Sequence, residues 1–313
     1  MITKKSTATH EEWKALRHKY IGGSDAAAVV GMNAWVSPLT LWAEKTGRLP
    51  GFEGNLATEV GTYLEEFVAQ KFAQETGKKV RKCNQSWFND QYPWAIANID
   101  RDIVGEDAGL EIKTTSELNL KSFKGGEYPV NYYTQCQHYM MVTGAEKWYV
   151  AVLVLGKAFH VFEIPRDEAY IATLIEAERA FWEEHVACKV PPLPTGSEAD
   201  GEALNALYPA AEVEDAAMDL GGLEDIVNLR AMKVTARDAL QEEIDEIDQQ
   251  IKAEMGTFER GVSGHWTVRW SNTESRRVDT KALKAKYPKI AEECMKVTAG
   301  RRFTVSKVET NEE

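Results

Sequence analysis

The chain has 313 residues, of which 43% are hydrophobic and 27% are charged, and its formal net charge at pH 7 is -12. That length supports one full hydrophobic core with a smaller appendage. Residues 1–10 are polar and lack an apolar signal region, and no run of residues approaches the roughly eighteen apolar residues of a membrane span. A cytoplasmic protein that does not bind a membrane is therefore expected.

The acidity is confined to one part of the chain. Residues 191–260 hold 5 basic and 17 acidic side chains, a net of -12, whereas residues 1–130 hold 16 and 17. The overall charge therefore does not exclude DNA binding by the first part. The cysteines show no Cys-x-x-Cys pair and the histidines no metal-ligand spacing, which argues against zinc sites and disulfides. These cysteines are Cys83, Cys136, Cys188 and Cys294.

A candidate anion site comes first along the chain. Gly22 and Gly23 allow a tight turn, and Ser24 is a good N-cap for a helix over residues 26–30. Free N–H groups at a helix start, with Arg17 close by, favour a bound anion. The local sequence fits an ordinary capped helix with a surface arginine equally well.

The next candidate residue lies on a predicted helix. Apolar side chains recur at helical spacing in residues 61–72 and predict one buried stripe. Glu65 sits at the edge of this stripe, where its carboxylate can reach inward toward a metal, whereas Glu66 is expected to be solvated. Plain core packing is the alternative.

Two carboxylates and a lysine then follow on predicted strands. Residues 94–100 are expected to form a strand ending in Asp100, and residues 109–113 the next strand. Alternation along a strand places Glu111 and Lys113 on one face. Hydrolysis of a phosphodiester needs hard oxygen ligands for Mg2+ and a cation or base beside the attacking water. The pattern predicts that chemistry, although two strands with a surface ion pair would produce it as well.

A second amphipathic helix is predicted over residues 132–142, followed by a strand over residues 147–155. Its Gln135 and Gln137 could hydrogen-bond a phosphate or the attacking water. Core packing alone would also explain this helix.

The expected domain boundary is a proline-rich segment at residues 189–197. Residues 1–190 would form one domain, 191–222 an acidic Pro/Ala-rich linker, and 223–313 a small α+β appendage. The appendage begins with a long helix over residues 223–255 that carries a coiled-coil-like apolar seam. A strand over 265–270, a helix over 279–295 and a closing strand over 301–305 follow. Self-association or partner docking is at least as favoured for it as DNA contact.

In this order, the elements resemble the PD-(D/E)XK nuclease superfamily. The segments Arg17–Gly31 and Ser37–Gly47 make the chain similar to its YqaJ-like viral recombinase family, which includes lambda-type exonucleases. The resemblance implies an α/β fold with a central mixed sheet flanked by helices. It also implies a phage-type Mg2+-dependent 5′-3′ exonuclease that acts on double-stranded DNA with free ends in a bacterial cell. Its product, a 3′ single strand, would pass to a phage annealing protein, and a ring-shaped homo-oligomer is implied.

The resemblance also implies roles for individual residues. Asp100, Glu111 and the carbonyl of Ile112 would ligate a first Mg2+, for which Mn2+ could substitute, and Glu65 would help with a second. Lys113 would position or deprotonate the water, which Gln135 or Gln137 would steady. Arg17 and Ser24 would bind the terminal 5′ phosphate.

The chain departs from the family pattern at one turn. The family often has Pro-Asp-Gly where this chain has Ile99-Asp100-Arg101, so Asp102 competes with Asp100 as the ligand. We favour Asp100, because it ends the apolar run. An endonuclease or nickase of the same superfamily is the alternative function, and a degenerate, non-catalytic DNA-binding protein is a third.

Overall fold

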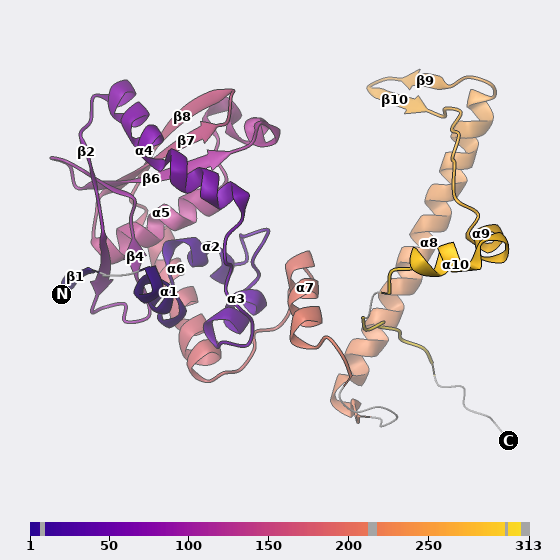
Figure 1. Ribbon diagram of the computed structural model, residues 1–313, viewed down its shortest axis with the longest axis horizontal. Helices are drawn as coiled ribbons and strands as arrows, with labels where there is room; N and C mark the ends of the chain where they lie inside the picture. Colours follow the sequence, from indigo (N-terminus) through magenta and orange to yellow (C-terminus); the bar gives the residue numbers. More distant parts are fainter. Residues whose placement is uncertain (7–9, 212–217, 298–299, 308–313) are drawn as a thin grey trace. The chain divides into compact units, whose positions relative to one another are not determined.

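The computed structural model describes residues 1–6, 10–211, 218–297 and 300–307. The chain divides into two compact units, Met1–Pro209 and Ala210–Glu313 (Figure 1). Each unit has its own elements and is described by itself.

A five-stranded mixed sheet forms the centre of the first unit, in the order β2-β5-β6-β7-β8. Only β6 and β7 pair in parallel, and their neighbours are antiparallel. The strands are β2 (Val80–Lys82), β5 (Arg101–Ile103), β6 (Ala108–Thr115), β7 (Lys147–Val154) and β8 (Ala158–Pro165).

Helices cover both faces of this sheet because its strands alternate between two apolar clusters. On one face, Leu110 of β6 packs with Val68 and Phe72 of α4 (Leu56–Thr76). On the other, Val150 of β7 packs with Met140 of α5 (Val130–Thr143). The layers therefore follow the period of two along each strand, and the α/β sandwich that the sequence predicts is confirmed.

The remaining elements of the first unit surround this core (Figure 1). A second sheet has the order β1-β3-β4, with β1 (Ile2–Ser6), β3 (Gln85–Asn89) and β4 (Ala97–Asn98). The helices are α1 (His10–Lys19), α2 (Gly23–Val29), α3 (Pro38–Lys45), α6 (Glu168–Ala180) and α7 (Glu198–Leu207), with a 3-10 segment η1 (Glu117–Gly126) and a π-helical segment η2 (Phe181–Ala187).

The second unit contains the long helix α8 (Glu224–Met255), which begins after the short 3-10 turn η3 (Gly221–Leu223). A hairpin of β9 (Arg260–Ser263) and β10 (Trp266–Arg269) follows, then α9 (Thr280–Lys286) and α10 (Pro288–Glu293). The predicted seam of α8 is exposed at Leu240, Ile244 and Ile247.

Five sequence expectations differ from the structure. Ser24 lies inside α2, whose N-cap is Gly22, and residues 279–295 contain two short helices, α9 and α10, where one was expected. Residues 94–100 form only the short β4 and a bridge from Ala95 to Ile21, and residues 301–305 form no strand. The first compact unit reaches Pro209, beyond the expected end at residue 190, because α7 packs on α3: the Thr40 hydroxyl donates to the carbonyl of Ala199 at 3.3 Å. Residues 212–217 of the expected linker lie outside the described residues.

Candidate active site

Strand β6 and helix α5 bring three of the predicted side chains into one hydrogen-bonded cluster. Glu111 and Lys113 share a face of β6, and Lys113 Nζ lies 2.7 Å from Glu111 Oε1. Gln135 of α5 faces them: Lys113 Nζ donates to its Oε1 at 2.9 Å, and its Nε2 donates to Glu111 Oε1 at 2.7 Å. Gln135 and Glu111 are both buried, so the cluster is held rigidly under α5.

Asp100 joins this cluster through the backbone of β6. Its Oδ2 accepts the N–H of Ile112 at 2.7 Å, which fixes the carboxylate at the residue between Glu111 and Lys113. Asp102 points elsewhere, because its Oδ2 accepts from Arg81 Nη2 at 3.0 Å. Of the two aspartates, Asp100 is therefore the one that lies at the cluster.

The two carboxyl groups Asp100 and Glu111 lie near a single lysine of the cluster, Lys113. Burial raises the pKa of Asp100 well above its usual value, and the Glu111 carboxylate raises it further, against the Ile112 N–H and Lys113. Burial lowers the pKa of Lys113, but Glu111 and Asp100 outweigh this and raise it overall. A hard divalent cation would relieve the repulsion between the two carboxylates.

One oxygen of the cluster has no partner. Glu111 Oε2 is buried and makes no hydrogen bond in the described part of the chain. Buried acceptors are rarely left unpaired in folded proteins, so this atom suits an oxygen-coordinated metal. The donor set that Asp100, Glu111 and the Ile112 carbonyl would supply therefore fits Mg2+.

Glu65 lies beside this centre but is held by a different cation. Its Oε1 is ion-paired with Arg101 Nη1, and Lys82 Nζ is 3.8 Å away. Glu66, expected in solvent, is largely exposed but pairs with Arg101 Nη2 at 3.1 Å. Among the described residues, no three His, Cys, Asp or Glu side chains converge as a metal cluster.

The two predicted glutamines have different surroundings. Gln137 is fully buried, donates to the carbonyl of Pro165 at 2.9 Å and accepts from the N–H of Asp167 at 3.0 Å. It therefore ties α5 to the start of α6 and lies outside the cluster. Of the two glutamines that were expected to steady a water, only Gln135 therefore lies at the cluster.

Arg17 and Ser24 are brought together as the sequence predicts, with Arg17 Nη2 donating to Ser24 Oγ at 3.2 Å. Asp25, next in the chain, pairs with Lys45 Nζ at 2.6 Å and lies 3.8 Å from Arg17. Burial raises the pKa of Asp25, but Lys45 and Arg17 outweigh this and lower it overall. Lys45 and Arg17 also line a hollow of about 460 Å³.

Helix α2 brings this second group against the first. A Cβ at Gly23 would lie 3.1 Å from Gln135 Cγ and 2.5 Å from Tyr139 Cε1, so only glycine allows this approach. Gln135 also donates to the Tyr139 hydroxyl at 2.7 Å. Ser24 therefore directly follows Gly23, which packs against Gln135 of the carboxylate cluster.

Sequence reasoning missed four residues with parts in this arrangement. Arg101 is buried among the acidic side chains, and Lys45 secures Asp25 and the carbonyls of Arg17 and Tyr20. Tyr139 and Tyr132 flank the cluster, and Lys113 Nζ lies 5.4 Å from the centre of the Tyr132 ring. Tyr132 and Tyr139 fall on the cluster's side of α5, a signal that the spacing from Gln135 could have given.

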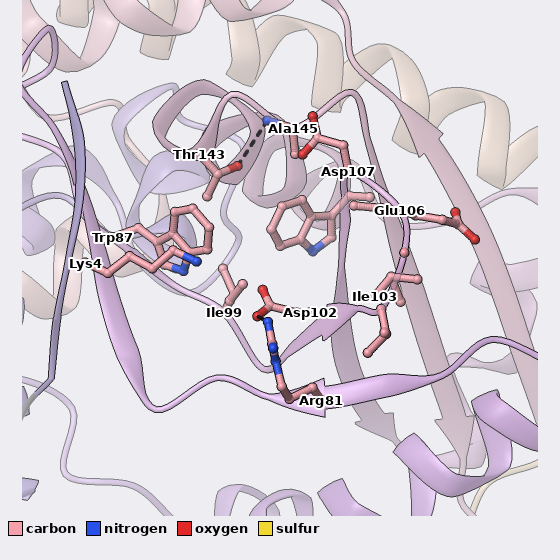
Figure 2. A pocket seen from close by; sticks show the side chains of 14 residues that line it. Lys4, Arg81, Trp87, Ile99, Asp102, Ile103, Glu106, Asp107, Thr143 and Ala145 are labelled. Atoms are coloured by element: carbon pink, nitrogen blue, oxygen red, sulfur yellow. Dashed lines mark hydrogen bonds and ion pairs between the residues drawn. The ribbon is translucent and has the colours of Figure 1, made fainter.

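A separate hollow of about 360 Å³ is lined by Asp102, the competing candidate, and by none of the residues favoured for the site (Figure 2). Figure 2 shows Asp102 paired with Arg81 inside it, with Trp87 and Lys4 at one side. The indole N–H groups of Trp87 and Trp148, which also lines it, have no hydrogen-bond partner among the described residues. Asp102 thus belongs to this hollow.

Comparison with known proteins places the chain in a family. A model of the YqaJ-like viral recombinase domain matches residues 12–146. The uncharacterized protein YqaJ of Bacillus subtilis (strain 168) is 39% identical over 313 residues, covering 98% of each chain. The chain belongs to the YqaJ-like viral recombinase family. The YqaJ-like match includes every residue predicted for the site, from Arg17 to Gln137.

Solved structures support the same placement. The alkaline exonuclease LHK-Exo from Laribacter hongkongensis is similar with a TM-score of 0.50 and 26% identity, over 57% of this chain and 94% of that one. The structure of LHK-Exo in complex with dAMP is similar with a TM-score of 0.51 and 25% identity, over the same shares. The YqaJ-like core therefore has the PD-(D/E)XK fold. No helix in the described ranges has the length and apolar character that crossing a membrane requires.

Proposed function

We propose that this protein is a Mg2+-dependent nuclease that degrades double-stranded DNA from a 5′ end. The observation that carries the proposal is the contact between two groups of residues. The cluster of Asp100, Glu111 and Lys113 meets the Arg17 and Ser24 pair through Gln135 and Gly23. The similar LHK-Exo structures, named as an alkaline exonuclease, support an exonuclease.

Asp100 and Glu111, with the carbonyl of Ile112, would hold the metal. Mg2+ neutralises phosphate charge and lowers the pKa of a water when it is bound there. Mn2+ is expected to substitute, since it accepts the same oxygen ligands. The unpaired Oε2 of Glu111 and the N–H bond that orients Asp100 support these assignments.

The chain's own residues position the substrate and stabilise charge. Lys113 is an ammonium anchored by Glu111 and Gln135, and it can stabilise negative charge that develops on the phosphate. Gln135 fixes the orientation of the Lys113 and Glu111 side chains through one hydrogen bond to each. Arg17 and Ser24, backed by Lys45, would bind a terminal 5′ phosphate and so place the end of one strand at the metal.

The biological setting rests on the family. Degradation of one strand from its 5′ end leaves a 3′ single strand, the substrate of a phage-type annealing protein in a bacterial cytoplasm. A ring-shaped homo-oligomer would keep the enzyme on its DNA. The unit Met1–Pro209 would be the catalytic part and the unit that contains α8 an accessory part.

Comparison of a linear duplex with a covalently closed circle, both incubated with Mg2+, tests the proposal. We expect mononucleotides from the 5′ ends of the linear duplex, a remaining 3′ single strand and an intact circle. Cleavage of the circle would favour the endonuclease or nickase. No cleavage of either substrate would favour a degenerate DNA-binding protein.

A further inference from the structure

Arg101 is the most deeply buried cation beside the candidate metal centre. It is the first residue of β5, pairs with Leu110 of β6 and is only 2% exposed. Its Nη1 bonds Glu65 Oε1 and the carbonyl of Asp100, the latter at 2.9 Å, and its Nη2 bonds Glu66 Oε2 at 3.1 Å. The guanidinium is therefore satisfied by three neighbouring acceptors in a fixed position.

This arrangement engages the Glu65 carboxylate in an ion pair with Arg101. A buried guanidinium that loses its carboxylate partner is left as an uncompensated charge away from water. A second Mg2+ on Glu65 would have to displace Arg101 or sit close to its positive charge, and both are unfavourable. Arg101 thus supplies a permanent positive charge at the place where a second metal would bind.

The first metal position is not blocked in this way. Asp100 offers its carbonyl to Arg101 but directs its carboxylate toward the N–H of Ile112. Glu111 makes no bond to Arg101, and its Oε2 is unpaired among the described residues. The Arg101 guanidinium therefore blocks metal binding at Glu65 and leaves the carboxylates of Asp100 and Glu111 available to a metal.

We propose that the centre binds one divalent cation per chain, on Asp100 and Glu111, and that Arg101 is a positioning residue that keeps Glu65 from ligating a second. The proposal rests on the metal-dependent nuclease function and replaces the expectation that Glu65 serves a second Mg2+. Glu65 then acts through Arg101, whose guanidinium also holds the Asp100 carbonyl.

The stoichiometry of Mn2+ binding to the full chain, measured by calorimetry and by the electron paramagnetic resonance signal of free Mn2+, tests this directly. Counted sites are those that Glu111→Gln or Glu65→Gln removes from the protein under test. We expect one site in the wild-type protein and one in Glu65→Gln, with an affinity changed less than about threefold, since Glu65 is not a ligand. Arg101→Lys, which keeps a cation, should also retain one site.

Arg101→Ala frees Glu65 and should raise the count to two, in protein shown to be folded by circular dichroism. Lys82→Ala is the matched control: it also removes a cation near Glu65, but Lys82 is 62% exposed and 3.8 Å away, so the count should stay at one. The Glu65→Gln and wild-type results decide the question even when Arg101→Ala does not fold.

Two wild-type sites that fall to one in Glu65→Gln would overturn the single-metal centre and leave the nuclease proposal standing. Absence of any site that depends on Glu111 would overturn the metal centre itself, and this inference with it.

Discussion

Gly23 lies so close to Tyr139 that a single methyl group at Gly23 would come 2.5 Å from Cε1 of the tyrosine ring. The absence of a side chain there lets α2, with Ser24, approach the face of α5 that carries Gln135. The Arg17–Ser24 pair and the carboxylate cluster are therefore joined by backbone packing.

Gly23→Ala should displace Tyr139 and Gln135 and so loosen the cluster. Overpacking of this kind costs about 1–3 kcal/mol of unfolding free energy, and we expect cleavage to fall with it. Urea denaturation and the cleavage rate measure both effects. Gly201→Ala in α7 is the control: no heavy atom lies within 4 Å of its added Cβ, so stability should stay equal or rise. A Gly23→Ala protein as stable and active as wild type would disprove the close packing.

Arg17→Ala should erase most of the preference for 5′-phosphorylated over 5′-hydroxyl ends. A charge-assisted bond from arginine to phosphate contributes roughly 1.5–3 kcal/mol, so about ten- to a hundredfold of the preference should disappear. Rates on matched linear duplexes give the ratio. Arg179→Ala, which removes an exposed arginine paired with Glu176, should leave it unchanged. Equal wild-type rates on both ends would remove the phosphate role.

The buried pair of His138 and Glu178 should make stability depend on pH. His138 Nδ1 lies 2.7 Å from Glu178 Oε1 and Nε2 lies 3.0 Å from the Ile96 carbonyl, with both side chains fully buried. Burial lowers the pKa of His138, but Glu178 and these hydrogen bonds outweigh it and raise the pKa overall. The stabilisation that the pair gives the folded state is fully present below the pKa of histidine in the unfolded chain, about 6.5. It is lost as pH rises through the higher pKa of His138 in the folded protein.

Denaturation of the wild type and Glu178→Gln across this range checks it. The wild type should lose unfolding free energy as pH rises above about 6.5, and Glu178→Gln should lose much less. Identical pH profiles would show that the pair is not ionised.

Asp200 should stabilise the junction of α3 and α7 except at very low pH. Burial raises its pKa, but the Ser37 and Thr195 hydroxyls, the Thr195 N–H and the Ser197 hydroxyl outweigh this and lower the pKa to about 2. A depressed pKa gives stability that is present above the unfolded value of about 3.9 and is lost as pH falls through the folded one. Its size is roughly 2–3 kcal/mol.

The Asp200→Asn protein should lack that stability at neutral pH. Its unfolding free energy should approach that of the wild type as the pH falls from about 4 to about 2. Unfolding free energies at several pH values measure the difference. A constant difference across this interval would contradict the hydrogen-bonded carboxylate.

The sequence predicts the parts of the site that depend on local periodicity. Glu111 and Lys113 share a face because they are two residues apart on a strand, and Arg17 meets Ser24 across one short turn. The Arg101 ion pair with Glu65 joins α4 to β5, and no local pattern encodes it. Gln135 and Gln137 have the same side chain and lie on the same helix, so the sequence alone does not show which of them reaches the cluster. Only the packing of α5 between the sheet and α6 decides this. The end of the first unit was misplaced because α7 follows a proline-rich segment yet packs on α3.

Cleavage of a linear, 5′-phosphorylated duplex in Mg2+ by Lys113→Ala, beside Lys147→Ala, tests the central claim most directly. Both lysines lie on strands of the same sheet, pair with a glutamate and are partly exposed, at 24% and 32%. Only Lys113 reaches the carboxylate cluster. We predict at least about a hundredfold loss of rate for Lys113→Ala, with an unchanged circular dichroism spectrum, and a wild-type rate for Lys147→Ala. A Lys113→Ala protein that degrades the duplex at the wild-type rate would contradict the assignment of this cluster as the catalytic centre.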